Sequence, residues 1–66
     1  SAAARLAQLT AKEREVLEMV AAGRSNRETA ETLRLSVRAV EDRRSRAMKR
    51  LGVESVADLV RLLSAK

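Results

Sequence analysis

Basic side chains are concentrated in one stretch of this sequence, and their chemistry suits contact with a polyanion. Residues 34–50 carry seven basic and two acidic side chains, a net charge of +5, which equals the whole excess of the 66-residue chain. Guanidinium and ammonium groups bind phosphate oxygens, and arginine can also donate two hydrogen bonds to a guanine edge. A solvated charged surface is the alternative, but it would not usually gather the entire excess in a quarter of the chain. The stretch therefore favours nucleic-acid binding.

The residue types that are missing narrow the partner and disfavour other functions. The chain has no aromatic residue, and modules that bind single strands or RNA stack the bases on aromatic rings. Duplex DNA is therefore the partner that we expect. Histidine and cysteine are absent too, which removes the commonest general base and the usual ligands of structural metals. We accordingly expect no enzymatic activity, no cofactor and no metal.

The stretch Ser36–Leu51 fits a single helix with its polar side chains opposite a narrow apolar stripe. At about 100° of rotation per residue, Val40 and Ala47 share that stripe with Leu51. The predicted base-reading residues, on the outward face and its shoulders, are Glu41, Asp42, Ser45 and Arg46. The predicted phosphate-binding residues, which include two at the start of the preceding helix, are Asn26, Arg27, Arg38, Arg43, Arg44 and Lys49.

Three of these residues have alternative readings that the sequence leaves open. Asp42 is spaced i, i+4 from an arginine on either side and could form ordinary ion pairs on the helix surface. Glu41 has no basic residue four positions on, so an ordinary surface ion pair is less favoured for it than for Asp42. Its other reading is a base contact, because a carboxylate can accept a hydrogen bond from cytosine. Asn26 could bind phosphate, or it could only assist the helix cap formed by Ser25.

Capping residues predict four helices. The predicted helix starts follow Thr10, Ser25, Ser36 and Ser55, and the glycines that mark helix ends are Gly23 and Gly52. Thr10, Ser25 and Ser55 each have an acid three residues later, the spacing of a capping box. The predicted helices span about residues 11–22, 26–34, 37–50 and 56–64. Because no strand pattern or proline interrupts them, the predicted fold class is all-α.

The two middle helices, joined by a tight turn at residues 34–35, predict a helix-turn-helix within a four-helix bundle. A plain helical hairpin is the alternative, which the charge on the second helix disfavours.

In the last helix, the residues predicted to face the core are Val56, Leu59, Val60 and Leu63, with Leu62 off that face. We expect residues 1–8 to be a linker or an expression remnant and residues 9–66 to be the domain. No apolar run approaches the roughly 20 residues of a membrane span and no signal peptide is visible, so a soluble, intracellular protein is expected.

With these features, the sequence resembles the LuxR/FixJ-type DNA-binding domain, which is found at the C-terminus of bacterial response regulators and related activators. The resemblance extends from Leu9 to about Leu63, through motifs such as Leu9-Thr10, Glu13–Leu17, Gly23–Glu28, Leu35-Ser36, Val40-Glu41 and Lys49–Val53. It implies a four-helix domain that binds promoter DNA as a dimer on inverted half-sites in the bacterial cytoplasm. Base contacts would then cluster at Glu41, Asp42 and Ser45.

The resemblance has further implications for partners, and the sequence also departs from the family pattern. The fourth helix commonly contributes to dimerisation, which makes Leu62 a candidate dimer contact, and RNA polymerase is a further candidate partner. No small molecule or membrane is implied for this domain. Departures from the usual residues are Thr29, Ala39, Asp42, Arg43 and Ala47. Base preference therefore cannot be transferred from relatives.

Three other functions compete with that of a response-regulator output domain. Region 4 of a sigma factor is a similar helix-turn-helix, but it would bind a promoter element only together with polymerase. A quorum-sensing or stand-alone LuxR-type regulator would share the domain but not the upstream receiver. A helical interaction module would place its basic face on an acidic protein, and titration with duplex DNA would distinguish it.

Overall fold

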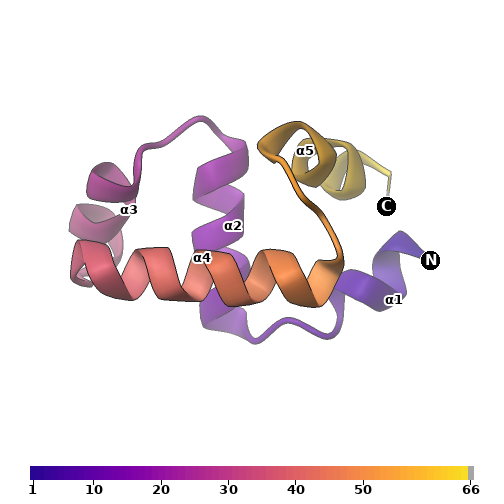
Figure 1. The fold of residues 1–66 in the computed structure, drawn as a ribbon, viewed down its shortest axis with the longest axis horizontal. Coiled ribbons are helices and arrows are strands. Elements are labelled where there is room, and N and C mark those ends of the chain that lie inside the picture. Colours follow the sequence, from indigo (N-terminus) through magenta and orange to yellow (C-terminus); the bar gives the residue numbers. More distant parts are fainter. Residues whose placement is uncertain (66) are drawn as a thin grey trace.

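The computed structural model describes residues 1–65 and consists, over these residues, of five α-helices without a strand. The helices are α1 (Ala2–Leu6), α2 (Ala11–Ala21), α3 (Asn26–Leu33), α4 (Val37–Leu51) and α5 (Val56–Ser64). In Figure 1 the long α4 runs across the front and α2 crosses behind it, with α3 at one end and α1 and α5 at the other. The predicted all-α fold class is confirmed, and the four expected helices start and end within one residue of their predicted bounds. Lys66, the last residue of the predicted domain, lies outside the described residues.

Hydroxyl caps start the four expected helices, as predicted. Two of them are complete capping boxes, in which Thr10 pairs with Glu13 and Ser25 pairs with Glu28 through reciprocal hydrogen bonds. The Oγ of Ser36 accepts a hydrogen bond from the amide of Ala39 at 3.0 Å, and that of Ser55 accepts from the amide of Asp58 at 3.1 Å. The third predicted box forms only in part: the Ser55 hydroxyl caps the helix, whereas the Asp58 carboxylate binds Arg61 at 2.6 Å and not the Ser55 amide. Each cap satisfies an orphan amide at its helix start.

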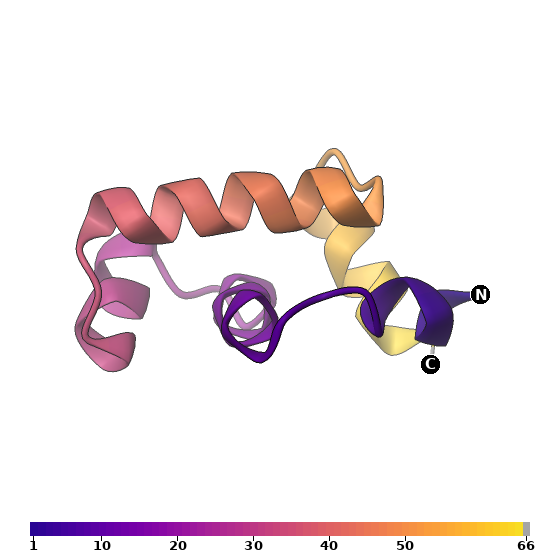
Figure 2. The same ribbon diagram turned by 90° about the horizontal axis from the view of Figure 1, so that it is seen from below.

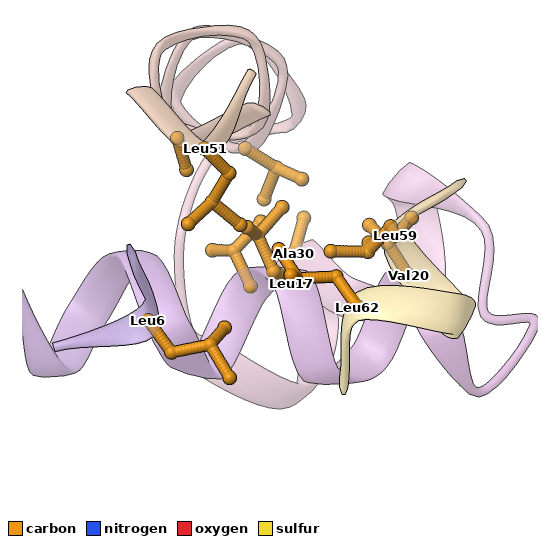
Figure 3. Packing of buried hydrophobic residues seen from close by; sticks show 10 residues of the cluster. Leu6, Leu17, Val20, Ala30, Leu51, Leu59 and Leu62 are labelled. Carbon is orange, nitrogen blue, oxygen red and sulfur yellow. The ribbon is translucent and has the colours of Figure 1, made fainter. Parts of the chain in front are cut away.

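The core lies between α2 and the helices around it, and it is built almost wholly from aliphatic side chains (Figure 3). Val40, Ala47 and Leu51 hold α4 to this core, and all three are buried as predicted. Thr29 is fully buried as well, at 0% exposure, and its hydroxyl donates to the Ser25 carbonyl at 2.9 Å. This hydrogen bond removes the desolvation penalty that an unpaired buried hydroxyl would carry.

The connection between α3 and α4 turns sharply without a glycine. Arg34, the C-cap of α3, adopts the left-handed conformation with φ 57° and ψ 47°. The amide of Leu35 then donates to the Ala30 carbonyl at 2.9 Å, which closes the last turn of α3. Since α4 begins at Val37, the two helices form the predicted helix-turn-helix.

The N-terminal segment is helical, which differs from the linker expected for residues 1–8. Helix α1 begins after a Ser1 cap, and its Leu6 side chain is buried in the core. Arg5 donates a hydrogen bond from its Nη2 to the carbonyl of Leu51, at the C-terminal end of α4. These contacts with residues far away in the sequence stabilise a helix of five residues that would be marginal alone.

Helix α1 also changes which side of α5 is buried. Leu59 and Leu62 face the core, with Leu62 only 8% exposed, whereas Val56 and Val60 are 37% and 40% exposed. The prediction for α5 was therefore wrong in part: Leu59 is buried as expected, but Val56 and Val60 are exposed, and Leu62, which was expected outside the buried face, belongs to it. The physical reason is that α5 packs between α2 on one side and α1 on the other, so its buried stripe turns toward α1.

Candidate nucleic-acid interface

Helix α4 presents one uncovered face along its whole length. Figure 2 shows α4 along one edge of the molecule, with α2, α3 and α1 on the opposite side. The exposed side chains of this face and its shoulders are Arg38, Glu41, Asp42, Ser45, Arg46 and Lys49. We call these six residues the outward row. An α-helix with its side chains is about 10–12 Å across and fits a B-DNA major groove about 12 Å wide.

The two carboxylates of the outward row are not engaged in ion pairs with other described residues. Among residues 1–65, the pairs within 4.0 Å join Arg14 to Glu18, Arg24 to Glu28, Arg50 to Glu13 and Arg61 to Asp58. The ion-pair alternative for Asp42 is thus not observed, although its spacing from two arginines permits it. Both carboxylates are free to accept hydrogen bonds from outside the chain.

On one flank of α4, an asparagine at the start of α3 contacts an arginine of α4. The Nη1 of Arg44 donates to the Oδ1 of Asn26 at 3.0 Å, and both residues are half-buried. Asn26 therefore contacts α4, while the capping oxygen of α3 comes from Ser25. Arg27 follows Asn26 and is exposed. The structure brings Asn26 and Arg44 together, as a shared contact to one phosphate would require.

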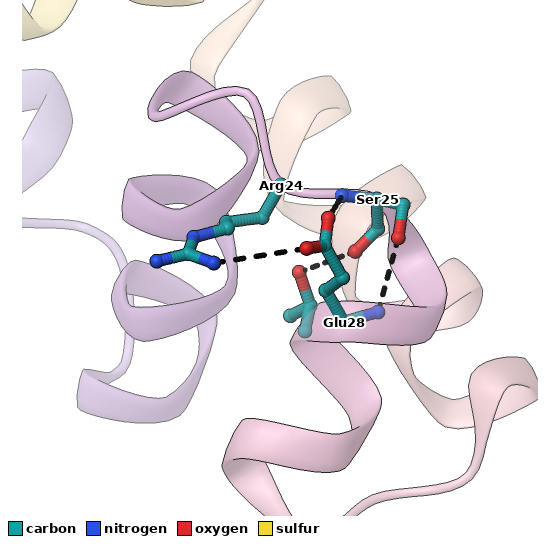
Figure 4. A network of polar contacts seen from close by, with 4 residues as sticks. Arg24, Ser25 and Glu28 are labelled. Carbon is teal, nitrogen blue, oxygen red and sulfur yellow. Dashed lines mark hydrogen bonds and ion pairs between the residues drawn. The ribbon is translucent and has the colours of Figure 1, made fainter.

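A polar network fixes the start of α3 and thereby the position of Asn26 (Figure 4). The Glu28 carboxylate accepts from the Ser25 amide at 3.0 Å, and Arg24 lies 3.7 Å from its other oxygen. The Ser25 amide, followed by its hydroxyl, holds the pKa of Glu28 below its ordinary value of 4.5, and Arg24 contributes further. A carboxylate that stays ionised also interacts favourably with the helix dipole at this end.

On the other flank, α4 meets the start of α2 around an open basic pocket of about 230 Å³. Its lining residues are Thr10, Lys12, Glu13, Arg43, Arg46 and Arg50. Arg43 is half-buried, as expected for a side chain whose stem lies along the core edge. Arg46, predicted to read a base, also lines this pocket, so its stem lies on the α2 side of the outward row. Its role stays a prediction.

Sequence reasoning missed Lys12 and Arg50 as members of this surface. The Nη1 of Arg50 donates to the Oε1 of Glu13 at 2.7 Å, which joins the C-terminal part of α4 to the first turn of α2. Arg50 follows Arg43 by seven residues, so helical spacing could have placed it on the same flank. Lys12 lies on another helix, and no local pattern indicates its proximity to Arg43.

Within residues 1–65, no cluster of three potential metal-ligating acids, histidines or cysteines occurs. None of the helices in this part of the chain combines the length and apolar character needed to cross a membrane.

Among curated proteins, the chain is similar to several that are named as bacterial response or transcriptional regulators. The chain is 48% identical over 54 residues to the tetrathionate response regulatory protein TtrR of Salmonella typhimurium, covering 82% of this chain and 26% of the relative. It is 43% identical over 53 residues to the transcriptional regulatory protein MctR of Rhizobium johnstonii, covering 80% and 25%. With the transcriptional regulatory protein FixJ of Bradyrhizobium diazoefficiens it shares 40% identity over 60 residues, covering 91% and 29%. The chain thus spans about a quarter of the length of these curated relatives.

The comparison with solved structures found no match. The family model described as bacterial regulatory proteins of the luxR family matches residues 7–63, which is most of the chain and includes all of α2 to α4. The chain therefore belongs to the LuxR family of bacterial regulatory proteins.

Proposed function

We propose that this chain is the DNA-binding output domain of a bacterial response regulator and that α4 enters the major groove of promoter DNA. The observation that carries the proposal is the outward row of α4, which is uncovered along its length and has arginines on both flanks. Three relatives named as response or transcriptional regulators support the regulatory role. Within a bacterium, such a domain would act in the cytoplasm, where promoter DNA lies.

Glu41, Asp42 and Ser45 are the residues we propose to contact base edges, together with Arg46 from the shoulder of the row. Carboxylates can accept from cytosine N4, a serine hydroxyl can donate or accept, and arginine can bind guanine O6 and N7. A carboxylate that met phosphate instead would lower affinity for every sequence, so the two acids should make binding selective at the expense of strength.

Phosphate contacts would hold α4 at the correct depth and register in the groove. The proposed contacts on the α3 side are Asn26, Arg27 and Arg44, and those along α4 are Arg38, Arg43 and Lys49. The Asn26–Arg44 hydrogen bond supports this role because it orients the guanidinium before DNA arrives. Such contacts add affinity without selecting a sequence.

Binding as a weak homodimer on inverted half-sites is part of the same proposal. Leu62 is buried within the monomer and is no longer a suitable exposed contact, whereas Val56 and Val60 of the same helix are exposed. We therefore propose that a dimer on DNA pairs two α5 helices through these valines. RNA polymerase would be a further partner of the whole regulator at a promoter.

Selection of binding sites from random duplex DNA tests the proposal directly. A preferred sequence with inverted half-sites is expected, and log affinity for it should fall linearly with log salt. A sigma region 4-like domain would not select an inverted repeat in the absence of polymerase. The absence of any preferred duplex, at low salt as well, would reject the DNA-binding function and favour an acidic protein partner.

A further inference from the structure

Two adjoining hollows on the α2 flank of α4 share the side chains of Lys12 and Arg43. The first, of about 230 Å³, is the basic pocket that also contains Arg46 and Arg50. The second, of about 300 Å³, extends from Lys12 and Arg43 to Arg34 in the turn between α3 and α4. Lys12 and Arg43 therefore stand at the junction of a continuous depression that runs beside α4.

The charge of this depression is strongly positive. Five basic side chains (Lys12, Arg34, Arg43, Arg46 and Arg50) line it together with two carboxylates, a net charge of +3. Glu13, one of the two, is matched by Arg50 at 2.7 Å. Within residues 1–65, neither Lys12 nor Arg43 has a carboxylate within 4.0 Å. Their charges are thus available to an anion from outside the chain.

The buried side of Glu13 gives the pocket a fixed wall. The Oε1 of Glu13 accepts hydrogen bonds from the Thr10 amide at 2.9 Å and from Arg50 at 2.7 Å, and the residue is only 8% exposed. This carboxylate is therefore turned into the protein and satisfied there. Because these two hydrogen bonds offset its charge, Glu13 would repel an anion in the pocket less than a carboxylate without partners would.

The depression lies on the flank of α4 where the second phosphate backbone that borders a major groove would pass. Arg44 and Asn26 lie on one flank of α4, and Arg43 lies on the other, since helical geometry separates the two arginines by about 100°. When a helix occupies the major groove, the two phosphate backbones pass along its two flanks. The backbone opposite the one near Asn26 would thus pass beside Lys12 and Arg43.

We propose that Lys12 and Arg43 form a binding site for a backbone phosphate of the DNA strand opposite the one held by Asn26 and Arg44. Helix α2, which otherwise supplies the core, then takes part directly in DNA binding through its first turn. This inference rests on the proposed function and assigns Lys12 a role in it. The recognised group is a phosphodiester, so the site does not depend on the base sequence.

Duplexes with single neutral methylphosphonate linkages test the site phosphate by phosphate. The duplex is the sequence preferred by the wild-type domain, and affinities are compared for wild type, Lys12→Gln, Arg44→Gln, the rescue variant Lys12→Arg and the control Arg61→Gln. Arg61 is on α5, with a side chain 76% exposed, and its loss removes the same charge away from α4. Circular dichroism verifies folding, which the exposed Lys12 should not affect.

We expect Lys12→Gln to make the slope of log affinity against log salt less steep by about 0.9 for each bound protomer, while Lys12→Arg preserves it. Within each half-site, the wild type should lose affinity when a particular phosphate on one strand is neutralised, and Lys12→Gln should show no further loss there. Arg44→Gln should become insensitive to a phosphate on the other strand of the same half-site. Arg61→Gln should match the wild type at every position.

Three outcomes would overturn the inference while leaving the proposed function intact. The first is that Lys12→Gln binds like Arg61→Gln, and the second is that Lys12→Gln keeps the full sensitivity of the wild type at every phosphate. The third is that, within one half-site, Lys12→Gln and Arg44→Gln become insensitive to phosphates of the same strand. If the wild type binds no duplex, both the site and the proposed function fail.

Discussion

The guanidinium of Arg44 on α4 donates to the side-chain oxygen of Asn26 at the first residue of α3, across 3.0 Å. The two halves of the helix-turn-helix are therefore joined by side chains as well as by the turn between them. A guanidinium held in this way loses little further freedom when it meets a phosphate.

Replacing Arg44 by glutamine should weaken binding about equally on preferred and unrelated duplexes, with the salt slope reduced by about 1 for each bound protomer. Asn26→Ala should weaken binding too, because the guanidinium is then no longer oriented. Since both changes remove one shared contact, the double variant should lose less than the sum of the single losses. Fluorescence anisotropy at several salt concentrations measures this, and an altered base preference in either variant would contradict the phosphate assignment.

Replacing Arg46 by alanine should relax the preference at one base pair by about 1–3 kcal/mol. The reason is that a bidentate arginine contact discriminates guanine from other bases. Site selection repeated with the variant identifies the position. A uniform loss on all sequences would show instead that Arg46 joins Lys12 and Arg43 at the phosphate.

Glu13→Ala should lower the free energy of unfolding by about 1–3 kcal/mol, because Thr10 and Arg50 lose a buried, charged acceptor. Glu18→Ala is the matched control, since Glu18 forms only an exposed i, i+4 pair with Arg14, and should change stability by less than about 0.5 kcal/mol. Urea unfolding gives both values from the shift in midpoint at constant slope. Equal effects of the two changes would mean that the Glu13 bridge adds no stability.

Leu6→Ala should destabilise the domain by about 2–5 kcal/mol, because Leu6 is buried in the core beside α5. Gln8→Ala, at an exposed position just after α1, should be nearly neutral. If Leu6→Ala proved equally neutral, residues 1–8 would act as a linker after all. The measurement is again urea unfolding, and in so small a domain a loss of this size should be easy to detect.

The stability of the start of α3 should depend on pH through Glu28. Its pKa is lowered in the folded state, first by the Ser25 amide, so its contribution is present above its ordinary value of 4.5 and is lost as pH falls through the lowered value. We therefore expect acid to destabilise the wild type in that range and to affect Glu28→Gln less. Unfolding midpoints measured from about pH 5 down to about pH 3 test the difference. Parallel curves for the two proteins would contradict the assignment.

Local signals in the sequence were sufficient to predict most of the helices. Thr10, Ser25, Ser36 and Ser55 cap their own helix starts, so the information needed to place each start lies within a few residues. The same holds for the buried stripe of α4, because a period of 3.6 residues identifies it without knowledge of its partners.

Features that depend on distant partners could not be predicted in the same way. Helix α1 is stabilised by contacts with Leu51 and with α5, some 45 or more residues further along the chain. Those contacts in turn decide that Leu62 is buried. The pairing of Asn26 with Arg44, and the meeting of Lys12 with Arg43, likewise follow from helix packing and have no signature in the sequence around any one of them.

Helices α1 and α5 both lie at the Gly52 end of α4, whereas Asn26 and the turn after α3 lie at the far end of a molecule about 32 Å long (Figure 1). A dye, a surface anchor or a fused protein attached ahead of α1 would therefore leave the molecule away from the Asn26 contact. This arrangement makes the α1 end of the chain a suitable attachment point for single-molecule measurements of binding. It also allows the domain to be grafted onto other proteins with the α3 end of its outward row left accessible.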